Sequence, residues 1–332
     1  MPTPEEYRSA IASCPSLRAA AKYLGVNKET VRRFRDKELL RGDEVKKPVI
    51  PDKNLPVEEI IKQAKDRFMR HKAKESSLKW MPFEMPDNKP IALAFMGDPH
   101  VDDDGCNWPL LERDILLLAN TKGVYGINCG DLTNNWVGRL MALYAEQSMT
   151  KSEAIKVVKW LIQDSGIDWL LINAGNHDAW NEGCYLLEQL VGDTSIMTDW
   201  AAKFKIVFPN KVEIRVDLAH DHKGNSQWNP LHAQMKQAKM GDTAHLYNAG
   251  HRHEGGIAQH EDPFKNIVYW LTRSRGYKYI DKYADLHGFG SQDYYATVMA
   301  VIDPTAEGVN QIMCFGDVEA GCKYLEYLRG RK

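Results

Sequence analysis

Polar residues that can bind metal or transfer protons follow five apolar segments of the sequence. The segments are IALAFMG, VYGINCG, WLLINAG, VEIRVDLA and HLYNAG. The residues that follow them include Asp98, His100, Asp131, Asn176, His177, His220, His251 and His253. Because the functional crevice of an α/β sheet lies at the carboxyl ends of its strands, we expect these eight side chains to converge.

Imidazole and carboxylate groups without a thiolate suit Mn²⁺, Fe or Zn²⁺ better than Ca²⁺ or Mg²⁺. Eight such groups exceed what one tetrahedral ion requires. Each residue alone has an ordinary interpretation as a hydrogen-bonded core histidine or a turn, and Asp102–Asp104 are interpreted as a solvated acidic loop. The ordered series at five strand ends instead predicts two ions that share one carboxylate.

The charge distribution indicates two units. The chain of 332 residues has a net charge of −2, but residues 1–90 contain 20 Lys and Arg against 14 Asp and Glu. The remainder is acidic. We therefore expect a basic front unit and an acidic back unit with different tasks.

The front unit contains SLRAAAKYLGVNKETVRRFRDKELL (16–40), which is typical of two helices joined by a tight turn. Ser16 and Asn27 are suitable N-caps, Gly25 suits the turn, and Val31, Phe34 and Leu39 are expected to face the first helix. With a helix over 4–13, the segment resembles the helix-turn-helix of DNA-binding domains. The resemblance implies DNA contact through Lys28, Arg32, Arg33 and Arg35, with a small bundle whose arginines are merely solvated as the alternative.

The expected domains are a helix-turn-helix domain at 1–48, a linker at 49–90 and a catalytic domain at 91–332. Prolines at 48, 51, 56, 82, 86 and 90 make regular packed structure across those points unexpected. Between them, 57–75 is expected to form an amphipathic helix with Ile60, Ile61, Ala64 and Phe68 on one side.

Five motifs of the back unit resemble, in their order, the calcineurin-like metallophosphoesterase superfamily over residues 91–255. They are GDPH (97–100), GD (130–131), GNHD (175–178), His220 and GHRH (250–253). The resemblance implies an α/β fold, a four-layer α/β/β/α sandwich, with a dimetal centre at the strand ends. We expect the small all-α helix-turn-helix domain to precede this α/β domain in the sequence.

The resemblance also implies a role for each residue. Asp98, His100 and His253 would hold the first ion, and Asn176, His220 and His251 the second. Asp131 would bridge both ions, and His177 would be the catalytic histidine, supported by Asp178. Asn134 and Asn135 stand where many relatives have an aspartate, a departure that argues against the protein Ser/Thr phosphatase branch.

The expected function is hydrolysis of DNA phosphodiester bonds by a hydroxide that bridges two divalent ions, with Mn²⁺ favoured over Fe or Zn²⁺. The motif order resembles that of the double-strand-break repair nucleases. The DNA-binding domain fused at the N-terminus resembles phage or prophage members of the superfamily. A phosphatase or cyclic-nucleotide phosphodiesterase with a regulatory head is one alternative. A DNA-binding regulator with little turnover is another.

Two further expectations concern the surroundings of the protein. The sequence contains no stretch of about 18 apolar residues, no signal-peptide pattern and no CxxC pair among its six cysteines. These absences predict a cytoplasmic protein that contacts no membrane. Self-association is left open. The segment 271–295 is rich in Arg, Lys and Tyr, which fits either a nucleic-acid contact or a surface loop.

Overall fold

A computed structural model describes residues 1–40, 53–279 and 296–331 of the chain. These residues form two compact units, Met1–Arg67 and Phe68–Lys332, which we call the N-terminal and the C-terminal unit. The protein belongs to the expected α/β class, and the expected helices are present at its N-terminus.

The N-terminal unit begins with three short helices whose ends are set by local capping. They are α1 (Pro4–Ser13), α2 (Leu17–Leu24) and α3 (Lys28–Leu40). The Ser16 hydroxyl accepts the N–H of Ala19 at 3.2 Å, and Asn27 Oδ1 accepts the N–H of Glu29 at 2.9 Å. Gly25 ends α2 at a φ of 64°, which glycine adopts without strain. The predicted caps and turn are therefore confirmed.

The three helices enclose a small core of Tyr7, Ala10, Ala20, Ala21 and Val31. Phe34 packs on it and stacks on Tyr7, with ring centroids 4.7 Å apart. Leu39 was expected to face this core, but it is 74% exposed. Its position near the end of α3 carries it beyond the reach of α2, so this expectation was wrong.

A fourth helix, α4 (Val57–Ser77), covers the segment expected to be helical. Ile60, Ile61 and Phe68, on its expected apolar side, are 43%, 48% and 63% exposed. No side chain of α4, all of which the structure describes, is buried.

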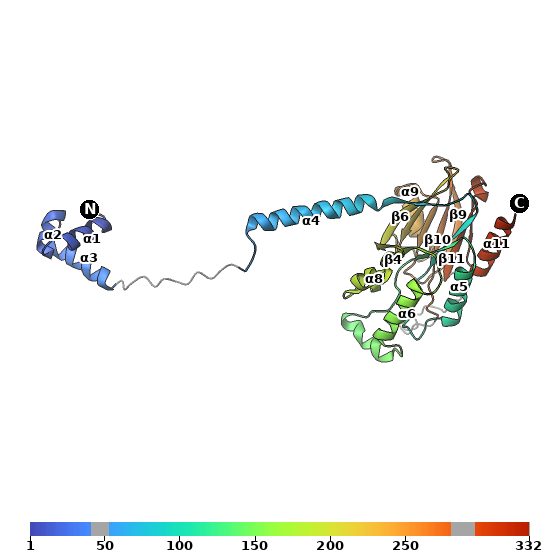
Figure 1. The fold of residues 1–332 in the computed structure, drawn as a ribbon, viewed down its shortest axis with the longest axis horizontal. Coiled ribbons are helices and arrows are strands. Elements are labelled where there is room, and N and C mark those ends of the chain that lie inside the picture. The colour runs from blue at the N-terminus through green and yellow to red at the C-terminus, as the bar shows by residue number, and fades with distance from the viewer. Residues whose placement is uncertain (41–52, 280–295, 332) are drawn as a thin grey trace. The chain divides into compact units, whose positions relative to one another are not determined.

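The C-terminal unit contains two mixed sheets of six strands each (Figure 1). The first has the order β12-β11-β2-β3-β4-β5. Its strands are β2 (Ile91–Met96), β3 (Val124–Asn128), β4 (Trp169–Ala174), β5 (Ile196–Asp199), β11 (Thr297–Ile302) and β12 (Ile312–Phe315). The strands β2 to β5 are parallel, whereas β11 is antiparallel to β2 and to β12.

The second sheet has the order β1-β6-β7-β8-β10-β9. Its strands are β1 (Lys79–Glu84), β6 (Ala201–Val207), β7 (Glu213–Ala219), β8 (Leu246–Ala249), β9 (Gly256–Asp262) and β10 (Ile267–Arg273). The pairs β7–β8 and β8–β10 are parallel. The carboxyl ends of β7 and β8 therefore lie side by side, as those of β2, β3 and β4 do in the first sheet.

One hydrophobic core combines side chains of both sheets. It includes Phe95 of β2, Leu171 of β4, Phe204 of β6, Val216 of β7 and Leu246 of β8, all fully buried. The strands β2 and β4 are nearly uniformly apolar, as strands covered on both faces are. In β6, by contrast, buried apolar residues alternate with more exposed ones. This core holds the two rows of strand ends in a fixed relation.

Helices pack against both sheets and form two further cores. The first core contains Leu111 of α5, Leu161 of α6, Leu187 of α8 and Leu325 of α11 together with residues of the first sheet. The second contains Ala238 of α9 and residues of β8 and β10. The helices are α5 (Trp108–Asn120), α6 (Lys151–Gln163), α8 (Gly183–Val191), α9 (His232–Met240) and α11 (Val318–Gly330). Figure 1 shows α5 and α11 side by side, and α9 elsewhere in the unit.

Short elements complete the unit: the 3₁₀ helices η1 (Gly138–Glu146) and η2 (Gly308–Asn310), and the single-turn helix α7 (Asn176–Ala179).

The strand β1 corrects the expectation for the proline-containing connector. Pro82 lies inside β1, where it is paired in register with Lys205 of β6. Proline is tolerated there because β1 is the edge strand of its sheet, so a missing N–H breaks no central ladder. The segment 79–84 thus belongs to the second sheet.

All six cysteines are free thiols. Within the described ranges, no helix combines the length and the apolar composition needed to cross a membrane.

Candidate metal centre

The five polar segments all follow strands at the neighbouring edges of the two sheets. Asp98 and His100 follow β2, Asp131 follows β3, and Asn176 and His177 begin α7 after β4. His220 follows β7, and His251 and His253 follow β8. The structure brings all eight candidate residues together, as expected.

Asp98 lies between two of the histidines. Its Oδ2 accepts the backbone N–H of His251 at 2.8 Å and lies 3.4 Å from Nε2 of His253. Its Oδ1 is buried and has no hydrogen-bond partner among the residues that the structure describes. The cationic neighbour nearest to this oxygen is Nδ1 of His220, at 4.0 Å. Because a buried carboxylate oxygen without a hydrogen bond is costly, Asp98 fits a position beside a bound cation.

Asp131 is the central carboxylate of the site. Its Oδ2 lies 3.2 Å from Nε2 of His220, 3.9 Å from Nε2 of His100 and 4.0 Å from Nε2 of His177. Its other oxygen accepts the backbone N–H of His177 at 2.9 Å. One carboxylate therefore faces three imidazole nitrogens that come from three different loops.

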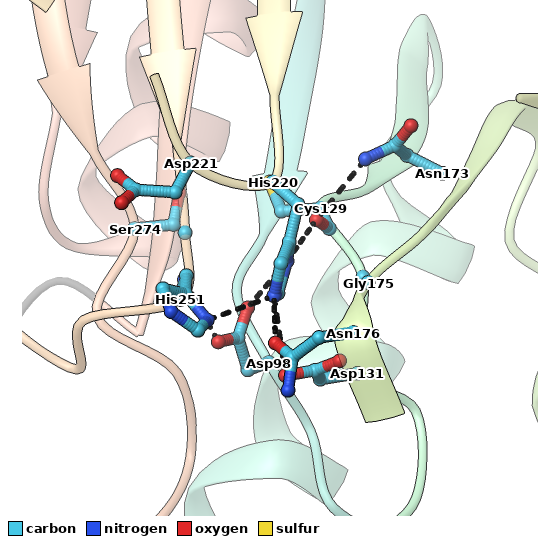
Figure 2. A network of polar contacts seen from close by, with 12 residues as sticks. Asp98, Cys129, Asp131, Asn173, Gly175, Asn176, His220, Asp221, His251 and Ser274 are labelled. Atoms are coloured by element: carbon cyan, nitrogen blue, oxygen red, sulfur yellow. Dashed lines mark hydrogen bonds and ion pairs between the residues drawn. The ribbon is translucent and has the colours of Figure 1, made fainter. Parts of the chain in front are cut away.

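His220 is surrounded by further ligand atoms (Figure 2). Its Nδ1 donates to the Cys129 carbonyl at 2.9 Å, which leaves Nε2 to face the site. That Nε2 lies 3.0 Å from Asn176 Oδ1 and 3.1 Å from His251 Nδ1, besides Asp131. A single ring nitrogen satisfies at most one of these neighbours by hydrogen bonding, so the convergence fits a shared cation.

Three groups of side chains place their ligand atoms within 4.8 Å of one another, as a bound metal ion requires. The groups are Asp98–His100–His253, His100–Asp131–His177 and Asp131–His220–His251. Asp131 belongs to two of them, and so does His100. Buried Asp and His groups of this kind can hold a metal ion.

The backbone of the ligand loops is unusual. His100, Asp131, His251 and His253 have φ values of 41°, 54°, 68° and 51°. Non-glycine residues rarely adopt this left-handed region, which costs free energy and is common at functional sites. Four candidate ligands share it, which indicates that the fold maintains an unfavourable backbone in order to aim these side chains.

Glycines beside the ligands allow the loops to approach closely. A Cβ atom on Gly175 would lie 2.2 Å from Asp131 Oδ1, and one on Gly250 would lie 2.5 Å from Asp98 Oδ1. Both contacts are far too short for any larger residue. The glycine of the GNHD motif is therefore required by the packing of Asp131.

The charges of the site are strongly coupled. Burial raises the pKa of Asp131, but His220 and then His177 outweigh burial and lower it to about 2. Burial lowers the pKa of His220, yet Asp131 and Asp98 raise it to about 10. Burial also lowers the pKa of His100 well below its ordinary value. The two carboxylates thus stabilise positive charge between the loops, as a cation site does.

Asp178 corrects one expectation. It was expected to support His177, but its Oδ2 accepts the backbone N–H groups of Asp131 and Gly175 and its Oδ1 accepts that of Leu132. The side chain is buried beneath the loop that carries Asp131. Asp178 therefore fixes the backbone of a candidate ligand.

His177 is oriented by the segment after Asp131. Its Nδ1 donates to the carbonyl oxygen of Asn134, and its own carbonyl accepts Asn135 Nδ2 at 2.9 Å. Its ring contacts the rings of Trp136 and Trp180, at centroid distances of 5.2 and 4.2 Å. Because a carbonyl only accepts, the proton is held on Nδ1 and Nε2 faces Asp131.

Asp102 corrects a second expectation, since it is not solvated. It is 3% exposed, and it accepts the N–H of Asn134 at 2.8 Å and Gln147 Nε2 at 2.7 Å. Asp102 thereby holds the backbone of Asn134, whose carbonyl oxygen orients His177.

Arg273 and Asp221 support the site and were not predicted. The guanidinium of Arg273 is fully buried and donates to the Gly250 carbonyl at 2.6 Å and to Asp221 Oδ1 at 3.1 Å. It fixes the turn before His251. The only signal for these two residues in the sequence is that Asp221 lies between two histidines, in the segment HDH (220–222).

The segment 271–295 was expected to be either a nucleic-acid contact or a surface loop. Arg273, Arg275 and Lys278 are all buried, so this part of the segment is neither a surface loop nor an exposed nucleic-acid contact. Residues 280–295 lie outside the described residues.

The four candidate DNA-contacting residues lie on α3. Lys28, Arg32 and Arg33 are exposed, and Arg35 is partly exposed. Arg32 lies 3.8 Å from both Glu29 and Asp36, and Arg35 lies 2.7 Å from Asp36. The α3 surface thus presents cations together with intrahelical ion pairs.

Comparison with known protein families and with curated proteins finds no family model and no protein that matches the chain.

Proposed function

We propose that the chain is a dimetal phosphodiesterase of the calcineurin-like metallophosphoesterase superfamily that hydrolyses DNA. The observation that carries the proposal is the shared carboxylate of Asp131, which belongs to two of the three ligand groups. A carboxylate common to two groups of imidazole ligands is the arrangement that a pair of ions needs. The motif order in the sequence supports the same family.

Two of the groups suggest the ligand roles. Asp98, His100 and His253 would hold one ion, and His220 and His251, with Asn176 beside His220, would hold the other. Asp131 groups with His100 and also with His220 and His251, so it would serve both ions. The predominance of imidazole favours Mn²⁺, with Fe or Zn²⁺ as alternatives. Bound divalent ions supply Lewis-acid activation of the phosphate and of the attacking water.

His177 moves a proton at Nε2. Its Nδ1 proton is held by the Asn134 carbonyl, so Nε2 is the atom that faces the reacting groups. In its protonated form, Nε2 donates to the leaving oxygen as the ester bond breaks. The Trp136 and Trp180 rings pack against the imidazole and restrict its rotation.

We further propose a four-layer architecture for the C-terminal unit and DNA recruitment by the N-terminal unit. The four-layer α/β/β/α order is supported by the core shared between the sheets and by the helices that pack on each sheet. The N-terminal unit is proposed to recruit DNA as a helix-turn-helix domain, with Lys28, Arg32, Arg33 and Arg35 at the phosphates. The exposed cations of α3 support this part.

A substrate panel with Mn²⁺ tests the activity. It contains single-stranded, duplex and nicked DNA, RNA, a cyclic nucleotide, bis-p-nitrophenyl phosphate and p-nitrophenyl phosphate. We expect both DNA and the diester to be cleaved faster than the monoester. Preference for the monoester or for the cyclic nucleotide identifies the phosphatase or cyclic-nucleotide alternative, and absence of turnover identifies a DNA-binding regulator.

The Asp131→Asn variant tests the shared carboxylate. We expect activity to fall by several orders of magnitude and the binding of both ions to weaken, because the amide is a poor bridging ligand. Two Mn²⁺ ions bound as tightly as in the unmodified protein, measured by calorimetry, contradict the bridging role.

A further inference from the structure

Trp200 lies at the edge of the candidate metal centre. It occupies the turn between β5 and β6. Its ring centroid lies 5.1 Å from that of His220 and 6.2 Å from that of His251. His220 is fully buried, whereas Trp200 is 43% exposed. A partly exposed indole thus lies beside two candidate ligands of the second ion.

Hydrogen bonds hold both the backbone and the indole of Trp200. The Trp200 N–H donates to the Ala174 carbonyl at 3.0 Å, and the Trp200 carbonyl accepts the N–H of His220 at 2.6 Å. The indole Nε1 donates to the Asp221 carbonyl at 3.2 Å. The ring is therefore held in one orientation before any ligand arrives, which lowers the entropic cost of binding.

Two features of Trp200 oppose stability. Its φ of 63° lies in the left-handed region, which is unfavourable for a bulky side chain. Its exposed apolar surface gains little from the hydrophobic effect. A residue that only shielded His220 would bury its ring, and glycine or asparagine would make the turn with less strain. Both costs are explained if the exposed face binds something.

We propose that Trp200 is a stacking subsite for an unpaired nucleobase next to the phosphodiester that is cleaved. The subsite rests on the proposed function, because the phosphodiester must lie at the metal centre for its base to reach the indole. Tryptophan stacks on any base, since every base has a π face. Paired bases inside a duplex have no free face, so the subsite selects single-stranded or unpaired nucleic acid.

Two small diesters separate this subsite from the chemistry. Thymidine 5′-(p-nitrophenyl phosphate) and methyl p-nitrophenyl phosphate have the same leaving group, and only the first has a base. For Trp200→Ala we expect kcat/KM to fall roughly ten-fold on the thymidine diester and to stay within about two-fold on the methyl diester. We expect the loss to lie mainly in KM, and Trp200→Phe to retain part of the preference.

Trp160→Ala is the matched control. Trp160 is 40% exposed and lies near the end of α6, where the neighbouring Leu161 carbonyl accepts the indole N–H of Trp169 at the start of β4. It therefore lies at the opposite edge of the sheet from the metal centre. Its removal is expected to change neither substrate's kinetics.

A binding measurement gives a readout without turnover. The probe is a fluorescein-labelled, phosphorothioate-linked oligonucleotide of about 12 thymidines, compared with an abasic oligonucleotide of the same charge. We expect the unmodified protein to prefer the thymidine probe by roughly ten-fold and Trp200→Ala to lose this preference. Both proteins should bind the abasic probe equally, since the phosphates are unchanged.

The outcomes distinguish the two proposals. Equal losses on both diesters, or on both probes, mean that Trp200 only maintains the metal centre and overturn the subsite. Unchanged kinetics in Trp200→Ala overturn it as well. If the unmodified protein cleaves neither diester, the proposed function fails, and the base preference of the probes alone decides the subsite.

Discussion

Asp178 accepts the backbone N–H of Asp131 at 2.6 Å through the same oxygen that accepts the N–H of Gly175 at 2.9 Å. One buried carboxylate thus joins the loops after β3 and β4. In Asp178→Asn an amide group replaces one oxygen, so at least one of the three backbone donors loses its acceptor. We expect Mn²⁺ affinity to fall by about 10- to 100-fold, as for other groups that orient ligands, in a calorimetric titration. The exposed Asp193→Asn is the control, and equal affinities in both variants contradict the role of Asp178.

His177 is assigned to proton transfer although its Nε2 lies within reach of a third ligand group. His177→Asn is therefore expected to keep two bound Mn²⁺ ions while kcat on bis-p-nitrophenyl phosphate falls by about 10²–10⁴-fold. Metal stoichiometry by elemental analysis and kcat are measured on the same preparation. The loss of one ion per chain would make His177 a ligand and remove its catalytic assignment.

His245 makes the stability of the C-terminal unit depend on pH. Its Nδ1 accepts the backbone N–H of Arg215 at 3.0 Å, and burial, then Arg215, lowers its pKa from 6.5 to about 4. Between these two values the unfolded chain takes up a proton that the folded protein excludes. The free energy of unfolding is therefore expected to decrease as pH falls from 6.5 to 4, by up to about 3 kcal/mol.

His245→Asn isolates that effect, because Asn Oδ1 can accept the same N–H without titrating. Urea unfolding at several pH values between 7 and 4 is compared for the two proteins. We expect the difference in unfolding free energy between them to shrink as pH falls. A difference that is constant with pH contradicts the assignment to His245.

Deletion of residues 1–48 tests the recruiting role of the N-terminal unit. The deletion removes 11 Lys and Arg and 7 Asp and Glu, but none of the eight residues of the candidate metal centre. Turnover of bis-p-nitrophenyl phosphate is expected to be unchanged, while DNA affinity falls and its salt dependence becomes shallower. Charge reversal at Arg32, Arg33 and Arg35 should reproduce most of that loss. Unchanged affinity and salt slope in the deletion variant show that the unit does not bind DNA.

Local signals in the sequence predicted a large part of the fold. The caps at Ser16 and Asn27 and the turn at Gly25 depend on residues one to three positions apart, so they can be predicted without knowledge of the tertiary structure. The convergence of the ligand loops was also predictable, because strands in parallel sheets end at a common edge.

The contacts that support the candidate ligands could not be predicted, because they join residues that are distant in the sequence. Arg273 pairs with Asp221 across 52 positions, and Asp178 reaches Asp131 across 47. Pro82 was interpreted as a break because its tolerance depends on an edge position that only the assembled sheet defines. Sequence patterns thus identified the candidate ligands but not the residues that orient them.

The left-handed backbone at His100, Asp131, His251 and His253 sets the proposed metal binding against thermal stability. Each such residue costs on the order of 1–3 kcal/mol, and glycine or asparagine at the same position removes much of that cost. A library of variants selected only for heat resistance, in the presence of a chelator, should therefore accumulate glycine and asparagine at these four positions. Each such substitution would relax the backbone and remove one proposed metal ligand.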